Sequence, residues 1–481
     1  MHDSREEMID EQKMDRWIEE HFDEYIELLT DYVAIPSVAK PDEDGLPFGR
    51  ACADMLRFME RTMTAHGLTT DDVDQRVMIG TLPGVYTAQP ECKTIGIACH
   101  GDVVPPEGDW VKDPYTLWKN GDWLTGRGST DNKGATIAVL FALRYLQEQG
   151  IRLKNNVNLY VGSAEEIGMF DMDYLVQHRP LPDFTLVPDA GFPVCYGEKG
   201  SMKFEAEAPI GDTNLVSFSA GDRGASVAAS ATAELRPILN SANMVKALNK
   251  FKGITAELAP ANGILVTSTG KARHTAFPDG GIDAIGQLAR VLDATSAVTG
   301  PAKKLIGFIG AITIDFHGEG LGVPLEDKES GKISDVLTVV RIKDGKLAIR
   351  FNVRYPVTAD AKKLETKIRT KITRAGFTFT DFQTSAASVA KLSPLIHELC
   401  DIANRVHGTK DRPYIMGGGT YARKMQPAVA YGMGTPSINI DPPFPAGQGR
   451  AHQPNESVYI PRMKKGIKIY AQALLAIDKA L

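Results

Sequence analysis

The 481-residue chain has few cysteines, no dense run of basic residues and no long apolar segment. Its five cysteines are odd in number and include no C-x-x-C pair, so neither a disulfide framework nor a thiolate zinc site is indicated. With 54 basic and 60 acidic residues the net charge is −6, which argues against a nucleic-acid or membrane-surface partner. The longest apolar-rich run, residues 135–143, is far shorter than the roughly 20 residues that a bilayer span needs.

The N-terminal residues are charged throughout and lack the apolar core of a secretory signal. Together with the cysteine usage, this predicts a cytoplasmic protein. The length exceeds that at which single hydrophobic cores stop growing, so we expect two domains.

The stretch at residues 94–104 organises the rest of the chain. It reads as an apolar strand that ends on His100 and Asp102, which lie two residues apart and therefore on one side of an extended chain. A neutral imidazole and a carboxylate in this place suit a transition-metal ligand and the group that orients it. The alternative is a polar loop after a strand, because His-x-Asp is a short pattern.

The surrounding pattern predicts a mostly parallel α/β sheet. Amphipathic helices are expected over 15–33 and 51–66, and Asp131 stands at the head of a helix that ends at Gly150. Two strand-like runs, 157–166 and 183–191, again finish on acidic residues. Polar residues gathered at strand ends are typical of a site at the carboxyl edge of such a sheet.

Beyond residue 195 the pattern changes to antiparallel strands and helices, including a β-hairpin signal around Lys343–Gly345. We therefore predict a catalytic domain formed by 1–195 and 385–481, interrupted by an α+β lid domain at 196–384. The chain returns through a helix that starts at Ser393-Pro394. The Gly-rich loop 417–423, the strand-like residues 428–434, a loop with a late histidine and a closing helix follow.

Five side chains are candidate ligands for two divalent metal ions: His100, Asp131, Glu166, Asp189 and His452. Imidazoles and carboxylates suit borderline divalent metals, and one carboxylate must then bridge the two ions. Each residue also has a simpler interpretation: a helix cap for Asp131, a solvated acidic pair for Glu165-Glu166, a turn for Asp189, a loop histidine for His452. Their joint occurrence at successive strand ends favours the metal site.

Glu165 and Glu166 are adjacent, and neighbouring residues of an extended chain point in opposite directions. One can therefore bind metal while the other takes a proton from the metal-bound water. We assign Glu166 as the ligand and Glu165 as the general base.

The segments CHGDVVPPEGDW, GRGSTDNKGA, SAEEIGM, PDAG and GGGTYAR, with the late His452, resemble the co-catalytic metallopeptidase family. This family includes carnosinases, aminoacylase, acetylornithine deacetylase and succinyl-diaminopimelate desuccinylase. The resemblance runs from about residue 15 to the C-terminus, and NVRYP with GGGTYAR makes the chain most like the bacterial dipeptidase V type.

The resemblance implies one metal on His100, Asp131 and Asp189 and another on Asp131, Glu166 and His452. Asp131 would bridge them, and the Asp131–Asn132 peptide bond would be cis. It implies that Asp102 orients His100 and that Glu165 is the general base. The metals would be zinc first, with manganese or cobalt as alternatives, since availability often decides.

From the lid, the resemblance implies that His274 stabilises the oxyanion and that Arg354 clamps a substrate carboxylate; Thr420, in the Gly-rich loop, is a further candidate substrate contact. A long lid of this type implies a monomer, with His274 acting in its own chain. Ala225 and Ala228 depart from the related pattern Asn…Pro, which puts substrate contacts of that loop in doubt.

We thus expect a metal-dependent dipeptidase that hydrolyses small dipeptides with a free C-terminal carboxylate, through a metal-bridging water activated by Glu165. An N-acyl amino acid deacylase or desuccinylase would share the metal chemistry. A non-catalytic relative that binds amino-acid-like ligands is the alternative from another class.

Overall fold

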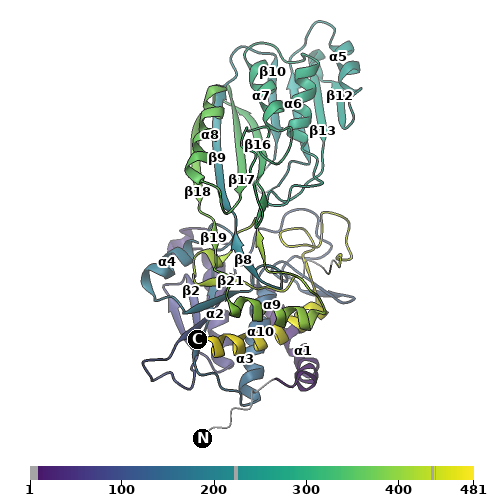
Figure 1. The fold of residues 1–481 in the computed structure, drawn as a ribbon. Coiled ribbons are helices and arrows are strands. Elements are labelled where there is room, and N and C mark those ends of the chain that lie inside the picture. The colour runs from purple at the N-terminus through teal and green to yellow at the C-terminus, as the bar shows by residue number, and fades with distance from the viewer. Residues whose placement is uncertain (1–8, 222–225, 435–437, 439) are drawn as a thin grey trace. The chain divides into compact units, whose positions relative to one another are not determined.

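The computed structural model describes residues 9–221, 226–434, 438 and 440–481 (Figure 1), and the chain divides into two compact units. Unit 1 comprises Met1–Gly197, Ala390–Tyr414 and Gly419–Leu481, and unit 2 comprises Glu198–Val389 and Ile415–Gly418. Ala225, where the sequence departs from its relatives' pattern, lies outside the described residues. Among the residues described, no helix combines the length and the apolar character needed to cross a membrane.

Unit 1 is built on a sheet whose strand order is β1-β2-β6-β3-β7-β21-β8. The inner strands β6, β3, β7 and β21 run parallel to one another, whereas β1, β2 and β8 pair antiparallel with their neighbours. The strands are β1 (Thr69–Val73), β2 (Val77–Leu82), β3 (Thr94–His100), β6 (Asn156–Gly162), β7 (Phe184–Val187), β21 (Ala428–Ala430) and β8 (Cys195–Glu198). The predicted mostly parallel α/β sheet is thereby confirmed.

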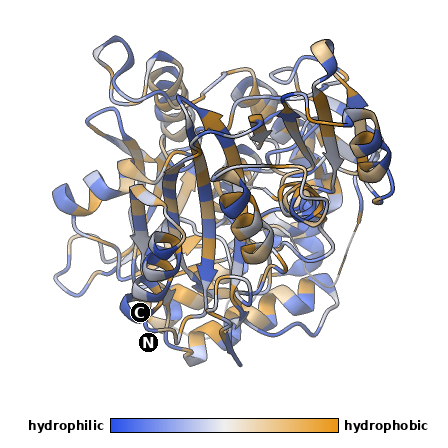
Figure 2. Ribbon diagram, turned by 90° about the horizontal axis from the view of Figure 1, so that it is seen from above, coloured by the Kyte–Doolittle hydropathy of each residue, from blue (hydrophilic) through white to orange (hydrophobic). Residues whose placement is uncertain are grey.

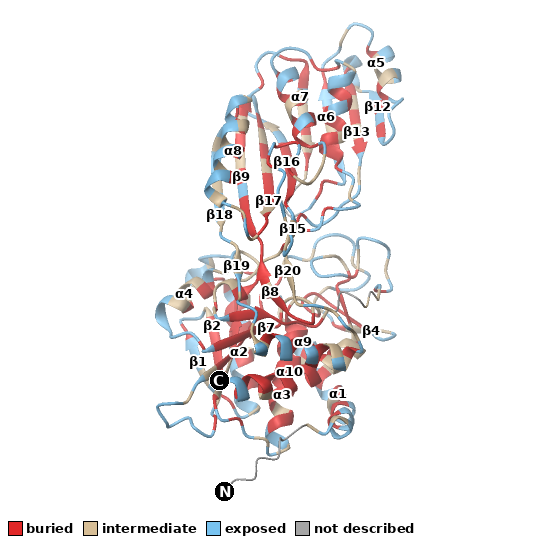
Figure 3. Cartoon of the chain, in the orientation of Figure 1, coloured by how far each residue is buried: buried red, intermediate tan, exposed pale blue. Residues whose placement is uncertain are grey.

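Within the residues that the structure describes, the α-helices of this unit are α1 (Glu11–Val33), α2 (Arg50–Ala65), α3 (Lys133–Glu148), α4 (Phe170–His178), α9 (Pro394–His407) and α10 (Ile460–Ala480). α3 is buried along most of its length, and Figure 3 shows its buried residues in red. Its apolar residues pack into one core with those of α1, α9 and α10. Ser393 caps α9, since its side chain accepts a hydrogen bond from Ile396 N, which confirms the start expected there.

Unit 1 also contains a small three-stranded sheet in the order β22-β5-β4. In the chain, β4 and β5 precede α3, and β22 comes directly before α10. The strands of this sheet are β4 (Trp118–Asn120), β5 (Trp123–Thr125) and β22 (Ser457–Tyr459). Because β5 precedes Asp131 and β22 follows His452, their pairing ties together two loops that carry candidate ligands.

Unit 2 contains an antiparallel eight-stranded sheet in the order β12-β13-β11-β10-β16-β17-β9-β18. Buried residues alternate with more exposed ones along the strands β11 and β13. Figure 2 colours the chain by hydropathy and shows bands of hydrophobic (orange) and hydrophilic (blue) residues along strands. The strands are β9 (Gly200–Pro209), β10 (Leu215–Ala220), β11 (Ser230–Leu235), β12 (Ile254–Leu258), β13 (Ile264–Thr269), β16 (Ser334–Lys343), β17 (Lys346–Tyr355) and β18 (Thr378–Ser385). The β16–β17 hairpin turns at Asp344-Gly345, where the sequence predicts it.

The α-helices in the described part of unit 2 are α5 (Ser241–Leu248), α6 (Ala284–Ala294), α7 (Ala302–Ile312) and α8 (Ala361–Arg374). All of them contribute apolar residues to a hydrophobic core of this unit. The remaining short strands are β14 (Glu326–Asp327), β15 (Gly331–Lys332), β19 (Ser388–Val389) and β20 (Tyr414–Met416).

Candidate metal centre

The first candidate ligand stands at the end of a buried parallel strand. β3 ends on His100 itself, so Asp102 lies beyond the strand rather than within it as predicted. Both side chains are buried, with His100 Nδ1 at 3.0 Å from Asp102 O and 3.4 Å from Asp102 Oδ1. These contacts leave His100 Nε2 directed at other acidic groups.

Asp131 faces two imidazoles, one through each carboxylate oxygen. Its Oδ1 lies 3.0 Å from His100 Nε2 and its Oδ2 lies 3.1 Å from His452 Nε2. Asn132, not Asp131, occupies the cap position of α3, so the helix-cap interpretation of Asp131 is wrong. The Asp131–Asn132 peptide bond is cis, as the resemblance implies.

Glu165 and Glu166 lie in a turn that follows β6, which ends at Gly162. The expectation of an extended chain through both glutamates is therefore wrong, because the strand stops three residues earlier. Two buried carboxylates hold this turn by its backbone. Asp102 accepts from Glu165 N (3.1 Å) and Glu166 N (3.0 Å), and Asp171 accepts from Ser163 N (2.7 Å) and Ala164 N (2.9 Å).

Glu166 reaches the second imidazole, with Oε1 at 3.0 Å from His452 Nε2. Asp189 reaches the first, with Oδ1 at 3.9 Å from His100 Nε2. The Asn132 amide donates to Pro188 O at 2.5 Å and lies 3.4 Å from Asp189 Oδ1, so it holds the loop that carries Asp189.

Negative charge dominates the centre and shifts its pKa values. Burial, followed by the charge of Asp189, raises the pKa of Glu165 well above its usual range, and burial with the charge of Asp131 does the same for Asp189. Burial lowers the pKa of His452, but hydrogen bonds to Asp131 and Glu166 outweigh it and raise it to about 11. Hydrogen bonds from both histidines likewise outweigh burial and lower the pKa of Asp131.

The residues fit divalent cations. Two groups present ligand atoms within 4.8 Å of one another: His100, Asp131 and Glu166, and His100, Glu165 and Asp189. The second contains Glu165, which the resemblance assigns as a base rather than a ligand. Carboxylates that lie close together repel one another, and this repulsion raises their pKa values. A bound cation can offset the repulsion in place of protons.

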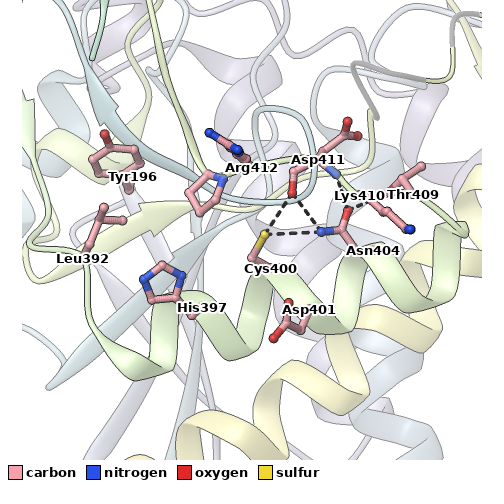
Figure 4. A pocket seen from close by; sticks show the side chains of 11 residues that line it. Tyr196, Leu392, His397, Cys400, Asp401, Asn404, Thr409, Lys410, Asp411 and Arg412 are labelled. Atoms are coloured by element: carbon pink, nitrogen blue, oxygen red, sulfur yellow. Dashed lines mark hydrogen bonds between the residues drawn. The ribbon is translucent and has the colours of Figure 1, made fainter. Parts of the chain in front are cut away.

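A cavity of about 230 Å³ opens beside these groups and is lined by both Asp131 and Asp189. A larger hollow of about 590 Å³ lies against α9, where Cys400 and Asn404 contact the carbonyl oxygen of Asp411 (Figure 4). Asp131 and Asp189 line the smaller cavity, whereas none of the predicted ligands lines the larger hollow.

The other predicted site residues are distributed over both units. Thr420, which is buried in unit 1, caps a short 3₁₀ helix (η3, Tyr421–Arg423) by accepting from Ala422 N. His274 and Arg354 lie in unit 2. His274 is exposed and follows β13, so it does not belong to the strand predicted there. Its Nδ1 accepts from Ala276 N (3.2 Å), and a neutral ring therefore carries its proton on Nε2. Arg354 is half-buried in β17.

Sequence reasoning missed several residues that support the centre. Asp171 is fully buried and also accepts from the Tyr421 hydroxyl, whose ring meets His100 edge-on with 6.2 Å between centroids. Asn132 and Glu456 are further examples. Asp171 stands in the first turn of α4, a helix that the sequence analysis does not predict, and an acidic residue in such a place gives no sequence signal that separates a buried acceptor from an ordinary residue of a helix start.

Known proteins share this chain's sequence and fold. The model of peptidase family M20/M25/M40 matches residues 96–476. The Bacillus subtilis protein named "Putative dipeptidase YtjP" is 28% identical over 90% of this chain and 92% of its own, and a Staphylococcus saprophyticus protein named "Putative dipeptidase SSP1012" is 26% identical over 95% and 97%. Human carnosine dipeptidase 1 (15% identity, TM-score 0.61) and the Saccharomyces cerevisiae dipeptidase Dug1p (15%, 0.58) each cover 97% of this chain and 98% of theirs.

The fold and the acidic, imidazole-bearing centre define a metallohydrolase. The family match spans well over half of the chain, so the chain belongs to peptidase family M20/M25/M40. The resemblance found in the sequence is confirmed.

Proposed function

We propose that the protein is a dipeptidase that requires two divalent metal ions and hydrolyses dipeptides with a free C-terminal carboxylate. The observation that carries the proposal is Asp131, which presents one oxygen to His100 and the other to His452. That is the arrangement expected of a carboxylate shared by two cations. The relatives named as dipeptidases support the choice of substrate.

His100, Asp131 and Asp189 would hold one ion, and Asp131, Glu166 and His452 the other. Two ions there would polarise the scissile carbonyl and acidify a water molecule. Zinc is proposed first, with manganese or cobalt as alternatives.

Glu165 would take the proton of the attacking water and return it to the leaving amine. Its backbone N–H donates to Asp102, which fixes the turn that carries it. Burial and then the charge of Asp189 raise the pKa of Glu165, so a cation that offsets the charge of Asp189 would remove one of these two causes. His274 would donate from Nε2 to the oxyanion, and Arg354 would bind the substrate carboxylate through two hydrogen bonds. Thr420 is proposed as a further substrate contact, and the protein is proposed to act as a cytoplasmic monomer.

The test is hydrolysis of a dipeptide panel by chelated protein, metal-reconstituted protein and reconstituted Glu165→Ala. Activity should return with metal and fall about 10²- to 10⁴-fold in Glu165→Ala while the metal content stays unchanged. Glu91→Ala, at an exposed glutamate, is the matched control and should retain activity. If the loaded protein bound metal but cleaved only N-acetyl or N-succinyl amino acids, the dipeptidase proposal would give way to a deacylase.

A further inference from the structure

Arg127 and Glu456 form a buried ion pair next to the loop that carries Asp131, the candidate bridging carboxylate. Arg127 Nη1 is 2.6 Å from Glu456 Oε2, and both side chains are 1% exposed. The other oxygen of this carboxylate, Oε1, accepts from the backbone N–H groups of Thr130 and Asp131, each at 3.0 Å. Every hydrogen bond to the Glu456 side chain therefore comes from the loop that carries Asp131 or from the arginine just before it.

The backbone of Glu456 is bound to the same loop. Its carbonyl oxygen accepts from Gly126 N (2.9 Å) and from Ser129 Oγ (3.2 Å), and Thr130 Oγ1 donates to the next carbonyl, that of Ser457 (2.7 Å). Glu456 lies four residues after His452, whose Nε2 is 3.1 Å from Asp131 Oδ2. Glu456 thus connects the backbone of Asp131 to the chain segment that carries His452.

We infer that Glu456, neutralised by Arg127, is a positioning residue that fixes Asp131 relative to His452 and thereby sets the affinity of the metal centre. The inference rests on the proposed metal site but not on the proposed substrate. Glu456 does not serve as a ligand itself, because its oxygens already accept three hydrogen bonds from protein donors. Groups that orient metal ligands in this way typically contribute a factor of about 10 to 100 in metal affinity.

Glu456→Gln tests this with almost no change in shape. An amide has only one oxygen, so its NH₂ group must face either Arg127 or the two N–H groups of the Asp131 loop, and either choice opposes donor to donor. The Asp131 loop should shift, and the two oxygens of Asp131 should lose their alignment with the histidines.

Asp478→Asn is the matched control. Asp478 is also buried and also accepts from two consecutive backbone N–H groups, those of Lys154 and Asn155, each at 2.9 Å. These residues precede β6, whereas the Glu165 turn follows it, and the seven-residue strand spans roughly 20 Å. The control therefore removes the same kind of contact at a distance from the metal centre.

The experiment titrates metal-free wild type and both variants with Zn²⁺ and Mn²⁺ against a chromophoric chelator, and records the Tm of each protein with and without metal. We expect Glu456→Gln to bind metal about 10- to 100-fold more weakly and to gain less Tm on loading, while Asp478→Asn binds within twofold of wild type. Unchanged metal affinity in Glu456→Gln, with only a lower metal-free Tm, would overturn the inference.

If Glu456→Gln were not recovered in folded form, Glu456→Asp would replace it. This variant keeps the charge opposite Arg127 but shortens the reach to the loop, and the same weakening is expected; unchanged affinity would again overturn the inference. A wild-type chain that bound both ions yet cleaved no dipeptide would refute the proposed activity alone. A wild-type chain that bound neither ion would remove the metal centre and this inference together.

Discussion

Asp102→Asn should displace the turn that carries the proposed general base, an effect that remains when the metal centre is saturated. The Asp102 carboxylate accepts from Glu165 N and Glu166 N through different oxygens and lies 3.4 Å from His100 Nδ1. An asparagine keeps one acceptor and turns a donor toward one of the two N–H groups. A lost hydrogen bond to a charged acceptor costs about 1.5–3 kcal/mol, and a buried unsatisfied donor costs about 1–3 kcal/mol more.

If most of this cost appears as displacement of the Glu165 turn, kcat/KM should fall about 10²- to 10⁴-fold, at 1.36 kcal/mol per factor of ten. The assay is dipeptide hydrolysis at saturating metal, with metal affinity measured in parallel. Asp283→Asn is the control, because Asp283 also accepts from two backbone N–H groups, as the cap of α6 in unit 2. A metal-saturated Asp102→Asn enzyme within threefold of wild type would refute the reasoning.

Two further predictions concern unit 2. Arg354→Lys should raise KM for free dipeptides far more than KM for substrates without the terminal carboxylate. The control is Arg350→Lys, at the residue paired with Glu205, which should change neither KM. Equal effects of Arg354→Lys on both kinds of substrate would exclude Arg354 as the clamp. Asp335 is 2% exposed, and burial raises its pKa from 3.8 to about 7, so its favourable contribution to folding is greatest below pH 4 and is lost as the pH rises through 7. The Tm of Asp335→Asn relative to wild type should therefore rise from pH 5 to pH 7 and then level off. This change corresponds to about 3 kcal/mol of stability at 1.36 kcal/mol per pKa unit, and a difference independent of pH in calorimetry would contradict it.

The periodic parts of the chain could be predicted from sequence because their signals are local. The α1 and α9 helices follow apolar spacing and a Ser-Pro start, and the β16–β17 hairpin follows its two-residue turn. The ends of strands could not be predicted as well. β3 and β6 stop at His100 and Gly162 because the chain leaves the sheet to bring side chains to its edge, and an apolar pattern does not show where that occurs.

The acidic residues show a deeper limit of sequence reasoning. Asp131, Glu166 and Asp102 all follow strands or precede helices, and residue type does not distinguish their tasks. The structure does so through the donors around each carboxylate. Asp131 and Glu166 direct oxygens at imidazoles, whereas Asp102 receives two backbone N–H groups.

The carboxylates therefore form two classes, those that face imidazoles and those that accept backbone N–H groups. Asp171 and Glu456, which the sequence does not mark, belong with Asp102 to the second class. Asp171 receives three backbone N–H groups and Glu456 receives two. A carboxylate whose oxygens are occupied by N–H donors has little capacity left for a cation, and one that faces an imidazole retains it. The two classes therefore depend on each other: the buried acceptors fix the backbone of the loops, and only a fixed backbone keeps the crowded ligand carboxylates close enough together to need a cation.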